Sequence, residues 1–322
     1  MIVTVTPNPA LDLTWHVASL AVGGTHRADA GQVRAGGKGL NVARVAHAQG
    51  APVVAVTTTG GATGAEFASE LASSGVPHVL VPVAGATRRS VALVDESLGD
   101  TTVVNERGIA PSDPEWQALR DAVAAALAGP HPAGPARVLV ISGSLPPGIP
   151  DDALPGLIRL GRDAGVTVIA DTSGPALLAA ADAGASVLKP NEHELRDATG
   201  LDDPIDGARE LIRRGARLVL LSLGADGMLA VSATASGGLS VLHARLGEPL
   251  AGNPTGAGDA GVAACAVLMD AGVHDPAQIL RRATAWSAAA VLMPLAGSIH
   301  PSWTDLEAAL TLTDRNNPKE IR

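Results

Sequence analysis

Aromatic residues, cysteine and an excess of positive charge are all missing or scarce in this chain of 322 residues. Aromatic side chains make up 2% of it, as four Trp, one Phe and no Tyr, so stacking platforms for nucleic-acid bases are not expected. The formal net charge of −9 argues against nucleic acid or an anionic membrane as a partner, because both attract basic proteins. An anionic small molecule must therefore be held by a few well-placed cations.

The single cysteine, Cys265, excludes an intrachain disulfide and fits a reducing compartment. It lies in an apolar run, where a small buried hydrophobe is its expected role. The nine His residues form no His-x-x-x-His pattern, and with no Cys-x-x-Cys pair no zinc site is predicted. No uncharged apolar run approaches the ~18 residues of a membrane span, and the N-terminus lacks the basic start of a signal peptide. We therefore expect a cytoplasmic protein with no membrane partner.

Apolar residues are abundant, at 46% against 17% charged residues, which is typical of a globular protein with a large core. Short β-rich runs alternate with helical stretches. We expect strands at residues 2–6, 53–57, 79–83, 137–142, 166–171, 186–189 and 218–223. We expect helices at residues 40–49, 62–74, 113–127, 151–164, 205–214, 260–271, 276–292 and 303–312. This alternation predicts an α/β fold whose parallel sheet lies between helices, with ligands at the carboxyl ends of the strands.

Two segments, 11–35 and 87–108, interrupt this alternation with half-polar runs that show no clear helix. Within the second segment, 88–95 and 101–106 predict a hairpin. We interpret both segments as a small β-sheet that projects from the core as a lid, although ordinary surface hairpins remain an alternative. The core then comprises residues 1–10, 36–86 and 109–322. The tail, 313–322, is expected to be frayed.

The most informative motif is Asn253-Pro-Thr-Gly-Ala-Gly-Asp259, directly before an apolar run that predicts a helix. The small residues Gly256, Ala257 and Gly258 leave backbone N–H groups open at the helix N-terminus, where the helix dipole also favours an anion. Asp259 beside this cradle is placed to take a proton from an attacking hydroxyl. The combination suits phosphorylation of a hydroxyl. A Gly-rich turn with an Asp cap is the plainer alternative, and the match to a dinucleotide Gly-x-Gly-x-x-Gly fingerprint lacks the strand and βαβ unit that it requires.

A second glycine-rich motif, Gly36-Gly-Lys-Gly-Leu-Asn41, opens a predicted helix. Its glycines allow close backbone approach, Lys38 offers a positive charge and Asn41 offers an amide. The motif differs from the Gly-x-x-x-x-Gly-Lys-Ser/Thr loop, because Gly39 follows the lysine. A flexible turn with a solvated lysine is the alternative.

Two further motifs directly follow predicted strands. Thr6-Pro-Asn-Pro-Ala-Leu-Asp12 brings Asp12 near the ligand edge, where a carboxylate can bind sugar hydroxyls, although an Asp is also ordinary in such a turn. Lys189-Pro-Asn-Glu-His-Glu194 places Asn191 and Glu194 on one face of a first helical turn. An amide with a carboxylate suits magnesium and its waters near a nucleotide, and an N-capped helix with acidic residues is the alternative.

Two signals are weaker. Ser222-Leu-Gly-Ala-Asp-Gly227 leaves a strand through a glycine turn that could flank a nucleotide, and Arg88-Arg89 places paired cations at the base of the small sheet.

Taken in order, all these motifs resemble the PfkB/ribokinase family of small-molecule kinases over nearly the whole chain. Within the family, the chain is similar to the branch of 1-phosphofructokinases and tagatose-6-phosphate kinases. Four motifs carry this similarity: Thr6-Pro-Asn-Pro-Ala-Leu-Asp12, Gly36-Gly-Lys-Gly-Leu-Asn41, Asn105-Glu-x-Gly108 and Ser142-Gly-Ser-Leu-Pro-Pro-Gly148.

The resemblance implies a ribokinase-like fold with a β lid that is often used for dimerisation, and a kinase that uses ATP and Mg²⁺. By this match Asp259 is the catalytic base, and Gly256, Ala257 and Gly258 form the anion hole. Contacts to a sugar phosphate are implied at Asp12, Gly37, Lys38, Asn41, Arg88 and Asn105. Contacts to the nucleotide are implied at Lys189, Asn191, Ser222, Gly224, Gly227 and Gly258. Asn191 and Glu194 are implied to hold magnesium through water.

Three departures from the family pattern are present. Asn253 stands where many relatives carry Asp, Leu13 where they often carry a basic or polar residue, and Arg89-Ser90 where some carry an Asn. The last two bear on the sugar rather than on the chemistry.

We expect transfer of phosphoryl from ATP to O6 of fructose 1-phosphate by a homodimer joined through the lid. The alternatives are a tagatose-6-phosphate kinase, a 6-phosphofructokinase, a catalytically silent sugar-phosphate sensor and, most remotely, a dehydrogenase.

Overall fold

The computed structural model describes residues 1–131, 134–234 and 237–316. A ten-stranded sheet forms its centre, in the order β14-β13-β12-β11-β10-β9-β8-β1-β4-β5. Seven neighbouring strands are parallel: β5 (His78–Pro82), β4 (Val53–Thr59), β1 (Ile2–Thr6), β8 (Val138–Ser142), β9 (Thr167–Asp171), β10 (Val187–Leu188) and β11 (Leu218–Ser222). Antiparallel strands extend the sheet beyond β11: β12 (Met228–Ala233), β13 (Leu239–Arg245) and β14 (Thr311–Asp314).

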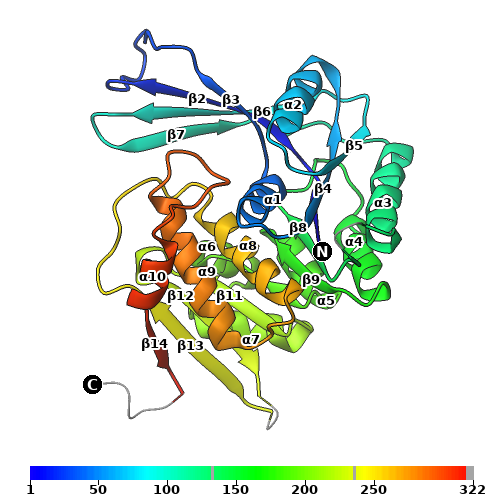
Figure 1. Cartoon of the computed structure of the whole chain (residues 1–322), viewed down its shortest axis with the longest axis vertical. Helices are drawn as coiled ribbons and strands as arrows, with labels where there is room; N and C mark the ends of the chain where they lie inside the picture. The colour runs from blue at the N-terminus through cyan, green and yellow to red at the C-terminus, as the bar shows by residue number, and fades with distance from the viewer. Residues whose placement is uncertain (132–133, 235–236, 317–322) are drawn as a thin grey trace.

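Helices cover both faces of this sheet (Figure 1). One face carries α1 (Lys38–Ala48), α2 (Gly61–Ser73), α8 (Ala257–Asp270), α9 (Pro276–Val291) and α10 (Trp303–Ala309). The other carries α3 (Asp113–Ala128), α4 (Ala153–Asp163), α5 (Pro175–Asp182), α6 (Glu192–Thr199) and α7 (Pro204–Arg214). Strands β1 and β8 are buried along their whole length because both faces are covered, which explains the nearly continuous apolar sequence of β8 and the small threonines, rather than charged residues, between the apolar residues of β1. The predicted α/β sandwich is confirmed.

Helix α8 lies between α1 and α9, and this position explains its composition. Most of its residues are buried, so it is apolar or small on almost every side. The helix begins three residues earlier than the sequence predicted, at Ala257 rather than at Ala260. Asp259 therefore lies in its first turn.

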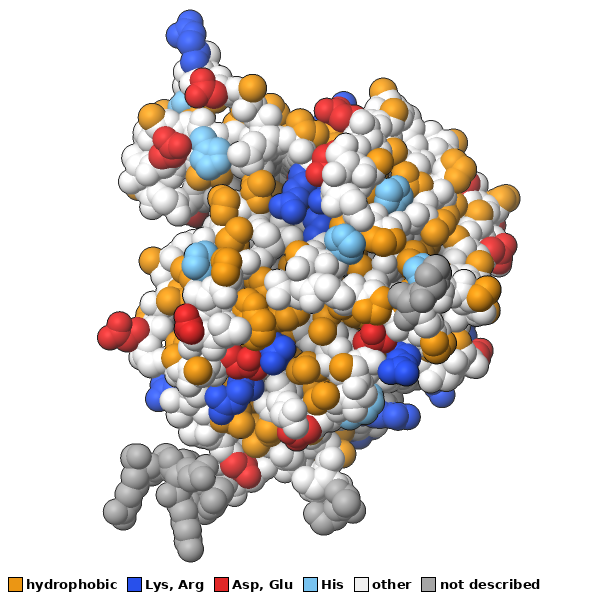
Figure 2. Space-filling model, in the orientation of Figure 1, with side chains coloured by type: hydrophobic (Ala, Val, Ile, Leu, Met, Phe, Trp, Pro, Cys, Tyr) orange, Lys and Arg blue, Asp and Glu red, His pale blue; other side chains and the backbone are white. Residues whose placement is uncertain are grey.

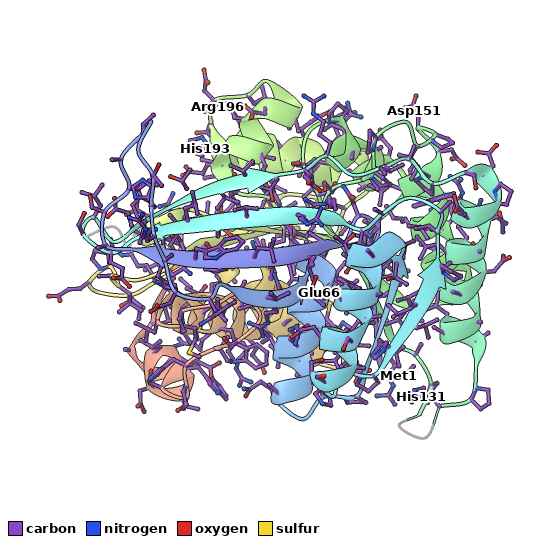
Figure 3. The ribbon with its side chains drawn as sticks, turned by 90° about the horizontal axis from the view of Figure 1, so that it is seen from above. Met1, Glu66, His131, Asp151, His193 and Arg196 are labelled. Atoms are coloured by element: carbon purple, nitrogen blue, oxygen red, sulfur yellow. The ribbon has the colours of Figure 1, made fainter. Side chains whose placement is uncertain are left out.

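A second sheet of four strands, in the order β3-β2-β6-β7, projects from one end of the molecule (Figure 1). Its strands are β2 (Ala10–Val17), β3 (Gln32–Gly36), β6 (Arg88–Asp95) and β7 (Asp100–Asn105). Seen from above, these strands lie across the core (Figure 3). The chain enters this sheet directly after β1 and leaves it directly into α1, so the carboxyl end of β1 and the start of α1 meet at its base.

Several elements differ from the sequence-based expectation. Strands β12 and β13 and helix α5 were not predicted, and α6 was recognised only through its first turn. The helix predicted at 303–312 ends at Ala309, and Thr311–Asp314 forms strand β14. The prediction of a tail frayed from residue 313 is therefore wrong for residues 313 and 314. Pairing with β13 stabilises these four residues, whose own sequence is too short to signal a strand. Residues 317–322 lie outside the described part.

Within 1–131, 134–234 and 237–316, no helix has both the length and the apolar character needed to cross a membrane.

Candidate active site

A cavity of about 1180 Å³ opens between the carboxyl ends of the parallel strands and the base of the second sheet. Figure 2 shows basic side chains close to the junction between the projecting sheet and the body. Every residue predicted for the site lines this cavity, from Asp12 and Lys38 to Ser222 and Asp259. The fold thus brings these separate motifs together, while the role of each residue remains a prediction.

Asp259 occupies the first turn of α8 and is only 5% exposed. The amide Nδ2 of Asn41, on α1, donates to its Oδ2 at 2.8 Å. The pKa of Asp259 is raised to about 7, because burial and, to a lesser extent, the charge of Asp171 outweigh the opposing effects of Lys38, Asn41 and Lys189. A carboxyl group with a pKa near neutrality is suited to accept a proton during a reaction.

The turn before α8 has the geometry of an anion cradle. Gly256 caps the helix with φ 84°, and a Cβ there would lie 2.7 Å from Cβ of Ala296, so only glycine fits. The first backbone bond between residues four apart runs from the N–H of Ala260 to the carbonyl of Gly256. The amides of Gly258 and Asp259 precede that bond and have no carbonyl within the helix, so they fit a phosphate group.

An ion pair between the half-buried Lys38 and the buried Asp171 lies beside Asp259. Lys38 Nζ is 3.4 Å from Asp171 Oδ2 and 3.7 Å from Glu194 Oε1. The hydroxyl of Ser142 donates to Asp171 Oδ2 at 2.8 Å. Burial alone would raise the pKa of Asp171, but Lys38, Lys189 and Ser142 outweigh it and the pKa is lowered. Asp171, not predicted from sequence, therefore carries a negative charge close to the carboxyl of Asp259, and the pKa of Lys38 is raised chiefly by Asp171.

The Asn191 and Glu194 side chains cap α6 reciprocally. Glu194 N–H donates to Asn191 Oδ1 at 2.8 Å, and Asn191 N–H donates to Glu194 Oε2 at 3.0 Å. Oε1 of Glu194 faces Lys38, whereas His193 and Arg196 lie on the outer side of α6 (Figure 3). Among the described residues no three His, Cys, Asp or Glu side chains gather to hold a metal. A single carboxylate fits Mg²⁺ that is bound mainly by phosphates and waters.

Another part of the cavity wall carries the nucleotide candidates. Lys189, which is 4% exposed, donates from Nζ to the hydroxyl of Ser222 at 2.9 Å. Burial lowers the pKa of Lys189, with Lys38 contributing, against the attraction of Asp171, Asp259 and Glu194. The Ser222 strand then turns through Gly224 and Gly227. A Cβ at Gly227 would lie 2.1 Å from the carbonyl of Ala244, so this turn also requires glycine.

At the base of the second sheet, Arg88 donates to the carbonyl of Asn8 at 3.2 and 3.3 Å and to that of Glu106 at 3.1 Å. Asp12 lies over Gly36: a Cβ added at Gly36 would lie 1.8 Å from Oδ2 of Asp12. Burial raises the pKa of Asp12 to about 6, against the lowering effect of Arg88 and two further arginines. Asp12 is therefore a desolvated carboxyl held among cations.

Several cavity residues were not assigned from the sequence, among them Asn8, Arg107, Ser144 and Asp171. Asn8 donates to the carbonyl of Arg107 at 3.1 Å and to the hydroxyl of Ser144 at 3.2 Å, which joins three loops. The first three belong to motifs that were recognised as whole stretches. Asp171 had a signal of its own, because it is a charged residue that ends an apolar strand on the ligand side of the sheet.

Proteins similar to this chain are carbohydrate kinases. The family model for pfkB family carbohydrate kinases matches residues 8–303. A 1-phosphofructokinase from Xanthomonas campestris is 35% identical over 294 residues, covering 88% of this chain and 89% of the relative. An ATP-dependent 6-phosphofructokinase isozyme 2 from Mycobacterium tuberculosis is 36% identical over 278 residues, covering 84% of this chain and 78% of the relative.

Among solved structures, phosphofructokinase-2 from Escherichia coli in complex with fructose-6-phosphate superimposes with a TM-score of 0.83 at 30% identity, over 95% of this chain and 98% of that one. The same enzyme has been solved in a tetrameric inhibited form, which superimposes with a TM-score of 0.84. A sugar kinase of this family is a phosphotransferase that acts on an alcohol group, with ATP as the phosphate donor. The chain belongs to the pfkB family of carbohydrate kinases.

Proposed function

We propose that this chain transfers the γ-phosphoryl group of ATP to O6 of fructose 1-phosphate, which yields fructose 1,6-bisphosphate and ADP. The observation that carries the proposal is Asp259, a buried carboxyl with a pKa of about 7 directly beside an open helix N-terminus. The same cavity holds a carboxyl for sugar hydroxyls at Asp12 and cations for a second phosphate. Several similar proteins are named 1-phosphofructokinase, which supports fructose 1-phosphate rather than fructose 6-phosphate as the proposed substrate.

In the proposed reaction Asp259 accepts the proton of the O6 hydroxyl as O6 attacks phosphorus. A bond forms between O6 and the γ-phosphorus, and the bond from that phosphorus to the bridging oxygen breaks to release ADP. The turn formed by Gly256, Ala257 and Gly258 stabilises charge on the moving group through the open amides of Gly258 and Asp259, since positioning and electrostatics dominate phosphoryl transfer. Magnesium, when bound with ATP, neutralises phosphate charge; Asn191 and Glu194 would hold it through water.

Nucleotide contacts are proposed at Lys189, Asn191, Ser222 and the glycine turn at Gly224 and Gly227. Support comes from their shared position on one wall of the cavity and from the two glycines, which let backbone approach a ligand. The buried Lys189 ammonium adds positive charge to this wall beside the helix N-terminus.

Lys38 and Arg88 are proposed to hold the phosphate that the substrate already carries, with Asn105 and the backbone at Gly37 completing the sugar site. Arg107 lines the same part of the cavity and adds a second guanidinium. The neighbours of Lys38, which include Asp171 and Asp259, also support a contribution to the moving phosphoryl group.

The segments 11–35 and 87–108 are proposed to form a lid over the core defined above, which excludes water and suppresses ATP hydrolysis. Most of β7 is exposed, and Val103 and Val104 are 45% and 60% exposed. These apolar side chains on an edge strand support a homodimer joined through the lid. A cytoplasmic location is proposed on the single buried cysteine, Cys265, which suits a reducing compartment.

The test is ADP release with Mg-ATP against fructose 1-phosphate, fructose 6-phosphate, tagatose 6-phosphate and ribose. A higher kcat/KM for fructose 1-phosphate supports the proposal. A preference for a 6-phosphate would retain Asp259 and the fold but assign the chain to the 6-phosphofructokinase alternative, which the relative from Mycobacterium tuberculosis represents. Absence of ADP release with every sugar would indicate the sensor.

A further inference from the structure

Arg34 connects the second sheet to the core by a side-chain hydrogen bond. It lies on β3 directly opposite Asp12 of β2, so both side chains point to the same face of the second sheet. Gly36, two residues further along β3, shares that face, and the Asp12 carboxylate lies over it. From this face Arg34 NH1 donates to the carbonyl of Ala296, in the segment after α9, at 2.5 Å.

The segment that contains Ala296 packs against the turn at Gly256, directly before α8. A Cβ at Gly256 would lie 2.8 Å from Cα of Ala296. A Cβ at the next residue, Gly297, would lie 3.1 Å from Oδ1 of Asn41, whose amide holds Asp259. Arg34 therefore holds the piece of chain that contacts both the N-cap of α8 and the hydrogen-bond partner of Asp259.

Other residues already attach β3 to the core. Arg44 donates to the carbonyl of Ala35 at 3.2 Å and pairs with Glu70 at 2.5 Å. Glu70 in turn accepts from the N–H of Ala35 at 2.8 Å. Both backbone groups of Ala35 are thus fixed by a pair that links α1 and α2. The Arg34 side chain is not needed for that attachment.

We propose that Arg34 is a positioning residue that links the sugar site at Asp12 to the phosphate-binding turn at Gly256 through the backbone of Ala296. The proposal rests on the function proposed above, in which Asp12 binds the sugar and the turn binds the transferred phosphoryl group. Because the guanidinium belongs to the second sheet and its acceptor belongs to the core, the bond reports where the sheet lies relative to the turn. Loss of Arg34 should therefore slow transfer and weaken its dependence on bound sugar.

The same side chain also influences the charge of Asp12. The groups that act on Asp12 are Arg88, Arg34 and Arg44, which favour its ionised form, and Glu70, which opposes it. Removal of Arg34 takes away one of these cations, so the pKa of Asp12 should rise further above its ordinary value. If the ionised carboxyl binds the sugar, KM for the sugar then begins to increase at a higher pH as the solution is made more acidic.

The experiment compares Arg34→Gln, Arg34→Lys and the control Arg27→Gln, an exposed arginine in the loop between β2 and β3. Steady-state kcat and KM are measured from about pH 5 to about pH 8.5, together with ATP turnover without sugar and Tm, using whichever sugar phosphate the wild type prefers. We expect Arg34→Gln to lower kcat by about 10-fold to 100-fold, as a misplaced reacting group does. Its ratio of sugar-stimulated to basal ATP turnover should fall, and the pH midpoint of sugar KM should rise.

Arg34→Lys keeps the charge without the planar fork, so it should restore the pH midpoint and leave kcat low. A merely structural arginine would lower Tm without moving that midpoint or the turnover ratio. The proposal would be overturned if Arg34→Gln and Arg27→Gln had the same kcat, the same ratio of sugar-stimulated to basal ATP turnover and the same pH midpoint of sugar KM. If Arg34→Gln does not fold, Arg34→Lys with wild-type kcat overturns it as well. A wild type that prefers a 6-phosphate refutes the proposed substrate alone, because each readout is relative to that wild type.

Discussion

Replacement of Asp259 by Asn should abolish most turnover and at the same time stabilise the protein. Asn has the shape of the protonated carboxyl and can still accept the hydrogen bond from Asn41. It cannot take a proton from the sugar hydroxyl. A general base contributes at least about 10²-fold, so kcat should fall by that factor or more.

The expected stabilisation follows from the raised pKa. The pKa of Asp259 is about 7 in the folded protein against an ordinary value of 3.8, a difference of about three units. Each unit corresponds to about 1.4 kcal/mol, so ionised Asp259 destabilises the folded state by on the order of 4 kcal/mol at alkaline pH. Asn never ionises, and the variant is free of this cost.

The sign of the effect gives it a pH window. A carboxyl whose pKa is higher in the folded state binds its proton more tightly there, so its stabilisation is complete below about pH 3.8 and is lost as pH rises through about 7. The difference in unfolding free energy between Asp259→Asn and wild type should therefore be small near pH 4 and largest near pH 8. Urea denaturation of both proteins at several pH values measures it, and a pH profile of kcat should rise through about 7 in the wild type.

A difference in stability that stays constant from acid to alkaline pH would refute the raised pKa of Asp259. Near-normal kcat in Asp259→Asn would remove this residue from the role of base even if the stability result held. The control is Asp163→Asn, at the end of α4, since it removes a carboxylate from another part of the chain. It should leave both kcat and its pH dependence unchanged.

Three other perturbations test separate parts of the site. Lys38→Ala should lower kcat and move its pH midpoint upward, because a cation near Asp259 is lost; an effect confined to KM for the sugar phosphate would support a substrate-phosphate contact alone. Gly256→Ala should destabilise the protein by about 1–3 kcal/mol in urea denaturation, because its φ of 84° is strained for alanine and Cβ of Ala296 lies in the way; unchanged stability would contradict this. Glu194→Gln should raise the Mg²⁺ concentration needed for half-maximal ADP release, whereas an unchanged requirement would exclude Glu194 from the metal's surroundings.

Most of the fold was predictable because its strands and helices carry strong local patterns. Fully buried strands such as β8 read as nearly continuous apolar runs, and long helices such as α3 and α9 have a clear period. The missed strand β14 is four residues long and exists through its pairing with β13. Its stability comes from a partner more than 60 residues away in the chain. Such elements have no local signal for sequence analysis to detect.

In the candidate site, too, some features could be predicted from local sequence and others depend on residues that meet only in the folded chain. Gly256 and Asp259 belong to one motif, so their proximity at the start of a helix was predictable from spacing alone. The charge state of Asp259 was not, because it depends on burial and on Asp171 and Lys38, which lie far apart in the sequence and meet only in the folded chain. Neither could sequence spacing show that Lys38 pairs with Asp171.

These residues explain how a carboxyl group with a pKa near neutrality is accommodated in the core. Burial makes the negative charge of Asp259 unfavourable, and Asp171 makes it more so. Lys38 and Lys189 limit the penalty without removing it, which keeps the pKa near 7 rather than far above it. Had these cations lain closer, Asp259 would be a weaker base; had they been absent, it would be protonated at neutral pH. Burial, the charge of Asp171 and the opposing charges of Lys38 and Lys189 therefore together set how readily Asp259 accepts a proton.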